Sequence, residues 1–207
     1  MVNDSGKPLE GFECLRSTQV TVVNTNRAKL CMARNVGAAV ATGKYLYFLD
    51  DDDYLLPGAL SALLSVAERS DSGWIYGGVR CVDGNDELVE EIRPEVTGNL
   101  FALLVAGESI SVVVSLIRRE VFISVGGFDP MLEILEDRDF ACRVAVISDF
   151  DRTDALVACC RVAHPTSTFD WSKAPRAARI LREKALSAPG ALARMADSVG
   201  KDVHRRG

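Results

Sequence analysis

The spacing of apolar residues along the chain predicts alternating strands and helices. Runs rich in β-branched and aromatic residues are typical of strands, and apolar positions that recur every three or four residues are typical of helices. The expected strands are 18–24, 45–49, 74–82, 87–92, 110–117 and 155–162. The expected helices are 28–41, 59–69, 100–106, 119–125, 133–147 and 175–199. Such alternation predicts an α/β sheet with crossover helices.

The chain changes character after its last predicted strand. From Pro175 onward the sequence is rich in Ala, Arg, Leu and Lys at helical spacing. A length of 207 residues suits one sizeable hydrophobic core better than two small ones. We therefore expect a main α/β domain over residues 1–165 and a helical carboxy-terminal appendage over residues 166–207.

An acidic run, Asp50-Asp51-Asp52-Asp53, follows directly on the predicted strand 45–49. This strand is apolar on both faces, as a central strand is, and α/β sheets bind ligands beyond the carboxyl ends of their strands. Adjacent carboxylates repel one another unless a cation neutralises them, and oxygen ligands suit Mg²⁺ or Mn²⁺. The alternative is that the run caps the next helix, and for Asp53 alone capping is the better interpretation.

A second acidic segment, Glu136-Asp137-Arg138-Asp139, lies at or near the start of a predicted helix. A carboxylate held there could accept a proton from a hydroxyl group. The alternative is a solvated helical face on which Asp139 pairs with Arg143 one turn later. The spacing alone favours this alternative.

Composition narrows the choice of partners. The net charge of −5 and the pI near 5.1 are unsuited to binding a nucleic-acid backbone. Six cysteines without a C-x-x-C pair indicate reduced thiols rather than a zinc site or a disulfide framework. No run of 18 or more apolar residues and no signal-peptide pattern are present, so we expect a cytoplasmic protein without a transmembrane segment.

Several motifs, taken in order, resemble family 2 glycosyltransferases of the GT-A fold. The resemblance extends over roughly residues 2–145. The segments that carry it are Arg34-Asn35-Val36-Gly37, Ala41 to Leu46, Leu49 to Asp53 with Tyr54 to Gly58, and Gly126 to Asp129 followed by Glu136-Asp137.

This resemblance implies a Rossmann-like, mixed and mainly parallel sheet flanked by helices. It also implies a nucleotide-diphosphate sugar donor, a hydroxyl acceptor of unknown identity, and Mn²⁺ or Mg²⁺ as cofactor. Family 2 members invert the sugar linkage, and the Q-x-x-R-W signature of processive synthases is absent, so a single inverting transfer is expected. A peripheral position at the inner membrane face and a homo-oligomer are compatible with this picture.

The resemblance also assigns roles to individual residues. Asp50 and Asp52 match the D-x-D pair at the diphosphate and the metal, with Asp51 between them. The general base falls on Asp137, with Glu136 beside it. The remaining donor-binding residues are Asp4 at the nucleobase, Arg34 at the diphosphate, and Gly127 and Asp129 beside the sugar.

His164 is a further candidate metal ligand by the same resemblance. A single histidine directly before Pro165 is more often an ordinary surface or packing residue. Both interpretations of His164 stay open at the level of sequence.

The chain departs from the family pattern at its amino end. The first strand, of the type V-S-V-I-I-P-T-Y-N, and the helix after it are not found, because Val2-Asn3-Asp4-Ser5-Gly6 matches the end of the second strand. A start placed too far downstream is the favoured explanation, over a decayed fragment or a chain completed by a partner.

Two rival functions remain at this stage. One is an inactive GT-A remnant that binds nucleotide or associates with a partner protein. The other is a phosphatase of the haloacid dehalogenase type, whose D-x-D-x-T pattern is broken here by Tyr54.

Overall fold

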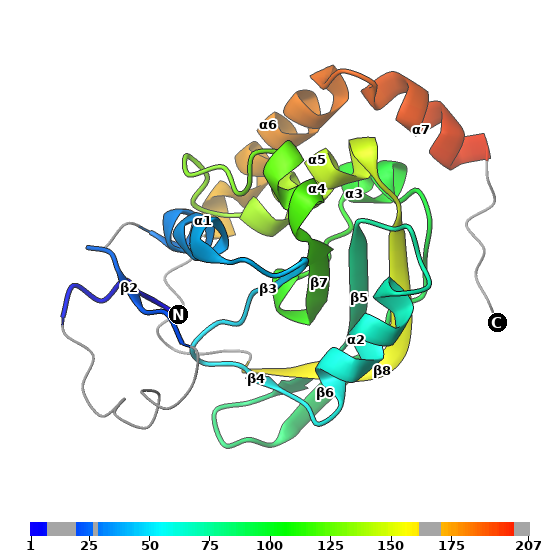
Figure 1. Cartoon of the computed structure of the whole chain (residues 1–207). Helices are drawn as coiled ribbons and strands as arrows, with labels where there is room; N and C mark the ends of the chain where they lie inside the picture. The colour runs from blue at the N-terminus through cyan, green and yellow to red at the C-terminus, as the bar shows by residue number, and fades with distance from the viewer. Residues whose placement is uncertain (8–19, 27–28, 162–170, 201–207) are drawn as a thin grey trace.

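The computed structural model describes residues 1–7, 20–26, 29–161 and 171–200 (Figure 1). The strands are β1 (Val2–Asn3), β2 (Val23–Asn24), β3 (Tyr45–Tyr47), β4 (Tyr54–Leu55), β5 (Trp74–Val82), β6 (Leu88–Ile92), β7 (Ser115–Arg118) and β8 (Phe150–Arg161). The α-helices are α1 (Leu30–Val40), α2 (Ala59–Ala67), α3 (Phe101–Ala106), α4 (Arg119–Ser124), α5 (Glu136–Ile147), α6 (Ala174–Ser187) and α7 (Ala191–Gly200). Short 3₁₀ turns are η2 (Val112–Val114) and η3 (Trp171–Lys173).

The main sheet is mixed and has β5 at its centre. Its order is β3-β7-β5-β8-β4, and β6 pairs with the second half of β5 beyond β7. The pairing of β5 with β8 is parallel, whereas β3 with β7, β5 with β7, β5 with β6 and β4 with β8 are antiparallel. The prediction of a mixed α/β sheet is confirmed, but the expectation that most pairings are parallel is wrong.

Alternation along β5 sends successive side chains to two separate cores. Trp74 and Tyr76 join the larger core with helices α1, α3, α4, α5, α6 and α7, and Ile75 joins the smaller core under α2. This is the two-residue period of a strand that is buried on both faces. Figure 1 shows the result as a three-layer arrangement, with α2 on one face of the sheet and the other helices beyond the opposite face.

The strands β1 and β2 form a separate, parallel two-stranded sheet next to α1. Gly37 of α1 faces Val2 so closely that a Cβ at this glycine would lie 3.1 Å from the Val2 side chain. The small sheet therefore contacts the fold through the same helix that carries Arg34.

The carboxy-terminal helices α6 and α7 pack into the larger core rather than standing apart from it. Leu181, Ala185 and Ala191 are each at most 5% exposed and belong to that core. In Figure 1 both helices lie across the outer side of the layer that contains α3 and α5. The predicted helical content of this region is confirmed for residues 174–187 and 191–200.

Three predicted strands begin about five residues from the expected position: β2 at Val23, β7 at Ser115 and β8 at Phe150. The segment 110–117 was predicted as a single strand. The structure has the 3₁₀ turn η2 at Val112–Val114, and β7 begins only at Ser115. In this turn the backbone N–H of Val112 donates to the carboxylate of Asp137 and is not part of a strand pairing.

Two properties expected from composition hold within the described residues. Cys31, Cys81, Cys142, Cys159 and Cys160 are free thiols, and the first four are buried. Across the described segments, no helix combines the length and apolar character that crossing a membrane requires.

Gly77 gives a test of the packing between β5 and β8. A Cβ there would lie 2.6 Å from a Val157 methyl carbon and 3.0 Å from the carbonyl oxygen of Ala155, and backbone cannot move aside easily. We expect Gly77→Ala to lower the free energy of unfolding by about 1–3 kcal/mol, measured by urea denaturation. Gly84→Ala is the control, because a Cβ at this exposed turn meets nothing within 4 Å. Equal stability of the two variants would contradict the close packing.

Candidate functional site

The acidic run lies in a turn that links β3 to β4. The backbone N–H of Asp53 donates to the carbonyl of Asp50 at 3.3 Å, which closes the turn. Asp51 and Asp52 are exposed, whereas the Asp50 side chain is 34% exposed. The predicted step from a strand into an acidic turn is confirmed, but the short strand β4, which was not predicted, precedes the helix α2.

Asp53 does not cap the following helix, so the capping interpretation is wrong. Helix α2 has Gly58 at its N-cap and no side-chain cap. Asp53 instead accepts a hydrogen bond from the backbone N–H of Arg161 at 3.3 Å, which fastens the acidic turn to the end of β8. Burial raises the pKa of the Asp53 carboxyl above its ordinary value.

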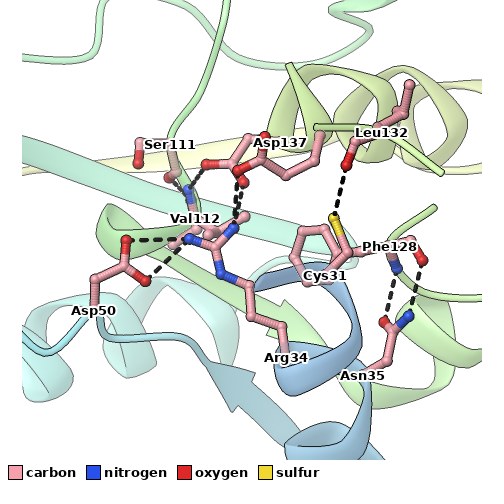
Figure 2. Close-up of polar contacts among 11 residues, drawn as sticks. Cys31, Arg34, Asn35, Asp50, Ser111, Val112, Phe128, Leu132 and Asp137 are labelled. Atoms are coloured by element: carbon pink, nitrogen blue, oxygen red, sulfur yellow. Dashed lines mark hydrogen bonds and ion pairs between the residues drawn. The ribbon is translucent and has the colours of Figure 1, made fainter. Parts of the chain in front are cut away.

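Arg34 joins the acidic turn to the second acidic segment (Figure 2). One terminal nitrogen, Nη2, donates to both oxygens of Asp50 at 3.0 and 3.1 Å. The other, Nη1, donates to Asp137 at 2.8 Å and to Glu136 at 3.3 Å. The predicted donor-site residues Arg34 and Asp50 therefore lie together with the predicted catalytic pair, although about 100 residues separate Arg34 from Asp137 in the chain.

Asp137 is held on both sides by hydrogen bonds. Its Oδ1 accepts from Arg34, and its Oδ2 accepts from the backbone N–H of Val112 at 3.1 Å. Each carboxylate oxygen has a second lone pair, so both can still accept a proton or a further hydrogen bond. The carboxylate is thus fixed in place, and its oxygens can still accept a proton or a further hydrogen bond.

Burial raises the pKa of the Asp137 carboxyl to about 6. The nearby Glu136 and Asp50 carboxylates push the pKa in the same direction, whereas Arg34 and the Val112 N–H oppose the rise. A group with a pKa close to neutral is well matched to accepting a proton at physiological pH. Such tuning is characteristic of catalytic acids and bases, and it is consistent with the role predicted for Asp137.

The site carries more negative than positive charge when its groups are ionised. Asp50, Glu136 and Asp137 bring three negative charges to the single positive charge of Arg34, an excess of two. Arg34 is only 8% exposed, and its Nε is buried without a hydrogen-bond partner among the described residues. A cation would therefore meet unbalanced negative charge here.

The loop beside this cluster is held by Asn35, the neighbour of Arg34. The Asn35 side chain donates to the carbonyl of Phe128 at 2.8 Å and accepts from its N–H at 2.9 Å. Gly127 has a φ of 70°, and a Cβ there would lie 2.6 Å from the Asn35 oxygen. Phe128 in turn lies under the guanidinium of Arg34, whose carbon is 5.3 Å from the ring centroid. Gly127 is thus required by this packing, independently of any role at a donor sugar.

Asp129, predicted at the donor sugar, faces α6 instead of Arg34. Its carboxylate accepts from Lys184 at 2.7 Å, and Lys184 also pairs with Asp139 at 2.8 Å. The hydrogen bond from Lys184 holds the pKa of Asp129 below its ordinary value. Asp139 is 3% exposed and pairs with Arg143. The predicted Asp139–Arg143 pair is therefore confirmed, but the prediction that it lies on a solvated helical face is wrong.

Asp4 lies at the small sheet, after β1. Its carboxylate accepts a hydrogen bond from the Thr25 hydroxyl at 2.5 Å. The candidate ligand His164 lies outside the described residues. The roles predicted for Asp4, Asp129, Gly127 and His164 stay predictions.

Four residues that matter for the geometry were not found from the sequence. Val112 acts through its backbone, and a backbone role leaves no signature in a side-chain pattern. Asn35 lies within a motif that was noted for its neighbour, Arg34. Arg138 donates to the carbonyls of Leu104 and Val105, and Lys184 reaches across from α6, two long-range contacts that no local spacing indicates.

The donor set fits a divalent metal in its chemistry. Within the part of the chain that the structure describes, no three His, Cys, Asp or Glu side chains are grouped closely enough to hold a metal ion. Magnesium in nucleotide sites is usually held by one or two carboxylates together with phosphate oxygens, so a full protein cage is not required. Asp50, Asp51 and Asp52 offer such carboxylates on an accessible turn.

Comparison with known proteins shows the family and the fold. Residues 4–125 match the sequence profile of glycosyl transferase family 2. A protein of Haemophilus influenzae described as an uncharacterized glycosyltransferase is 30% identical over 149 residues, which are 70% of this chain and 50% of that protein. The chain therefore spans half the length of this curated relative.

Solved structures of S. aureus TarS share the fold. Residues 1–349 of TarS in complex with UDP-GlcNAc superpose with a TM-score of 0.70 at 16% identity, covering 96% of this chain and 61% of that one. The same TarS segment in complex with UDP gives a TM-score of 0.66 at 16% identity, covering 96% and 60%. At this identity the likeness establishes the fold.

The profile match covers more than half of the chain, and the curated relative and the fold agree with it. The chain belongs to glycosyl transferase family 2, and its fold is that of the GT-A glycosyltransferases, as the sequence motifs predicted. The rival assignment to the haloacid dehalogenase phosphatases is thereby excluded.

The opposing influences on Asp137 allow a direct test of the site. Because Arg34 lowers the pKa of this carboxyl, Arg34→Gln should raise the pKa above about 6. We expect ¹³C NMR of the Asp137 carboxyl carbon to show the titration midpoint moving to higher pH. Arg80→Gln, which removes an exposed pair with Glu91, is the control and should leave the midpoint unchanged. A midpoint that stays fixed in Arg34→Gln would disprove the electrostatic coupling.

Lys184 provides a test of how α6 supports the loop. Lys184→Met should lower the free energy of unfolding by about 1–2 kcal/mol, because buried Asp139 keeps Arg143 but loses its second cation. Lys173→Met is the matched control, since it breaks an exposed pair with Glu133 that is worth about 0–1 kcal/mol. Chemical denaturation of both variants checks the difference, and an equal loss in the two would refute a specific role for Lys184.

Proposed function

We propose that this chain transfers a sugar from a nucleotide-diphosphate sugar to an acceptor hydroxyl, with Asp137 as the general base and a divalent metal at the acidic turn. The observation that carries the proposal is the position of Asp137. Arg34 bridges it to Asp50, so the expected proton acceptor and the expected diphosphate site share one side chain. Family membership makes sugar transfer the reaction to test first.

Asp137 accepts the proton in the proposed reaction. The acceptor oxygen attacks the anomeric carbon as its proton moves to Asp137, and the bond from that carbon to the diphosphate breaks with its electron pair on the phosphate oxygen. Attack opposite the leaving group inverts the linkage, and one such displacement adds one sugar. A pKa of about 6 leaves the carboxyl mostly ionised at pH 7 and able to take the proton.

Asp50 and Asp52 hold the metal in this proposal, and Arg34 supports the diphosphate. A bound Mg²⁺ or Mn²⁺ supplies positive charge against the phosphate oxygens of the leaving group. The negative excess of the site gives a reason for the metal, since a diphosphate adds further negative charge. The buried guanidinium of Arg34 offers a second cationic group next to the acidic turn.

A uridine nucleotide is the first donor base to test. TarS, which shares the fold, has been solved with UDP-GlcNAc and with UDP. In the proposal Asp4, beyond β1, contacts the base. The acceptor in the proposal is a compound that carries a hydroxyl group.

A catalytically inactive nucleotide-binding or partner module is the second candidate. Nucleotide binding needs only Arg34 and the acidic turn, whereas transfer also needs Asp137 in its proposed role. The two candidates agree on nucleotide binding and differ in turnover.

Calorimetric titration of UDP and GDP into the purified chain, with and without Mn²⁺, tests the proposal. We expect metal-dependent binding by the parent chain and at least a tenfold weaker affinity in Asp52→Asn, because this change removes a metal ligand. Asp71→Asn, an exposed aspartate before β5, is the control and should bind as the parent does. Equal binding by Asp52→Asn and the parent would reject the metal site.

Asp137→Asn separates binding from chemistry within the same experiment. The amide keeps the size of the side chain but cannot take the proton, so nucleotide affinity should persist while release of nucleoside diphosphate in the presence of acceptor is lost. Retained turnover in this variant would rule out Asp137 as the base. Binding without turnover in the parent chain would favour the inactive module.

A further inference from the structure

A cavity of about 470 Å³ lies between the β5–β6 hairpin, helix α3 and the segment that leads into η2. Its volume falls within the range of about 300–1,000 Å³ that is typical of small-molecule sites. Its lining includes Tyr76 and Val79 from β5, Ile92 from β6, and Leu103 and Leu104 from α3. None of the residues assigned above to the metal, the diphosphate or the base lines this cavity, so it is separate from them.

The inner wall of the cavity is apolar and rigid. Tyr76 is 6% exposed and Leu104 is 1% exposed, and the Tyr76 hydroxyl is already satisfied by the carbonyl of Val96 at 2.7 Å. A ligand inside would therefore meet carbon atoms and few free polar groups. Burial of an apolar group of the ligand is the interaction that such a wall can offer.

The rim of the cavity disfavours anions. The exposed residues that line it include Glu95 and Glu108, and its one lining cation, Arg93, is bound to the carbonyl of Asp154 and the carboxylate of Glu91. Two carboxylates with an engaged arginine leave negative charge at the entrance. A phosphate-bearing ligand would be repelled, whereas a neutral one would not.

The cavity wall is tied to Asp137 by two hydrogen-bonded connections. Ser111 lines the cavity, and the next residue, Val112, donates its N–H to Asp137 at 3.1 Å. On the α3 side Leu104 lines the cavity, and its carbonyl accepts from Arg138, the neighbour of Asp137, at 2.9 Å. Figure 2 shows Ser111, Val112 and Asp137 in sequence along the first of these connections. A ligand in the cavity would therefore lie against backbone segments that are hydrogen-bonded to the proposed base and to its neighbour Arg138.

We propose that this cavity binds the uncharged apolar part of the acceptor, an aromatic or branched alkyl group that carries the hydroxyl to be glycosylated. This inference rests on the proposed function, because it assigns the acceptor of that same reaction. The class of acceptor is thereby a neutral apolar alcohol rather than a sugar phosphate or a phosphorylated lipid.

Fluorescence titration with N-phenyl-1-naphthylamine, a neutral probe that brightens in apolar surroundings, tests the cavity without any nucleotide. We expect saturable binding that 4-phenylphenol displaces and that 4-phenylphenyl phosphate displaces at least tenfold less well. Lack of saturable binding, or equal displacement by the two compounds, would overturn the proposal.

Ile92→Trp should weaken probe binding at least tenfold by filling the cavity from its rim. Ile92 is 51% exposed, so the larger side chain is tolerated by the fold. Leu88→Trp is the matched control, because Leu88 lies on the same strand, is 60% exposed and does not line the cavity. Its affinity should stay within twofold of the parent. Unchanged binding by Ile92→Trp would place the probe elsewhere and refute the assignment.

NMR of the backbone amides tests the connection to the base. Saturation with 4-phenylphenol should shift the Val112 N–H signal, which reports on the bond to Asp137, and leave Gly84 unmoved. A stationary Val112 signal with the alcohol bound would disprove the acceptor role. If nucleotides bind and the alcohol does not, this inference fails while the proposed function stands. If the alcohol binds and nucleotides do not, both fail.

Discussion

The buried guanidinium of Arg34 is the interaction on which the arrangement of the site depends. Removing a charge from water is costly unless it is paired and hydrogen-bonded, and Arg34, at 8% exposure, meets this cost with Asp50, Glu136 and Asp137. The partners come from the turn after β3 and from the first turn of α5. One side chain of α1 therefore fixes how these two segments face each other, and loss of Arg34 would leave three neighbouring carboxylates without their shared counter-charge.

Around Arg34, the loop before α5 is held from two directions. Asn35 binds both backbone groups of Phe128 from α1, and Lys184 binds Asp129 from α6. Lys184 also reaches Asp139, which brings a carboxy-terminal helix into contact with the helix that carries Asp137. Together with the buried Leu181, these contacts make α6 part of the support of the site as well as of the core.

The sequence predicted the positions of strands and helices better than the relative directions of the paired strands. Residues 74–82 were predicted as a strand with the observed bounds, because an apolar, β-rich run ends there at the turn beginning with Asp83. The number of parallel pairings was overestimated, since alternation of strands and helices does not show that β7 runs antiparallel to both of its neighbours, β3 and β5. The acidic runs drew attention to Asp50 and Asp137, and the family resemblance drew attention to Arg34. The contacts of Val112 and Lys184 could not be predicted, because they depend on backbone position and on tertiary packing.

One segment of the chain, from Ser111 to Val114, lies between the charged cluster and the apolar cavity. The segment from Ser111 to Val114 touches the apolar cavity through Ser111 and Val114 and the acidic cluster through the N–H of Val112. A carboxyl at the boundary of an apolar region loses hydration, which explains why burial is the main cause of the raised pKa of Asp137. Because Arg34 opposes that rise, the same guanidinium that orders the two acidic segments also keeps Asp137 ionised near neutral pH. The contact with Arg34 thus influences both the position and the protonation state of Asp137, and a change to Arg34 would alter both.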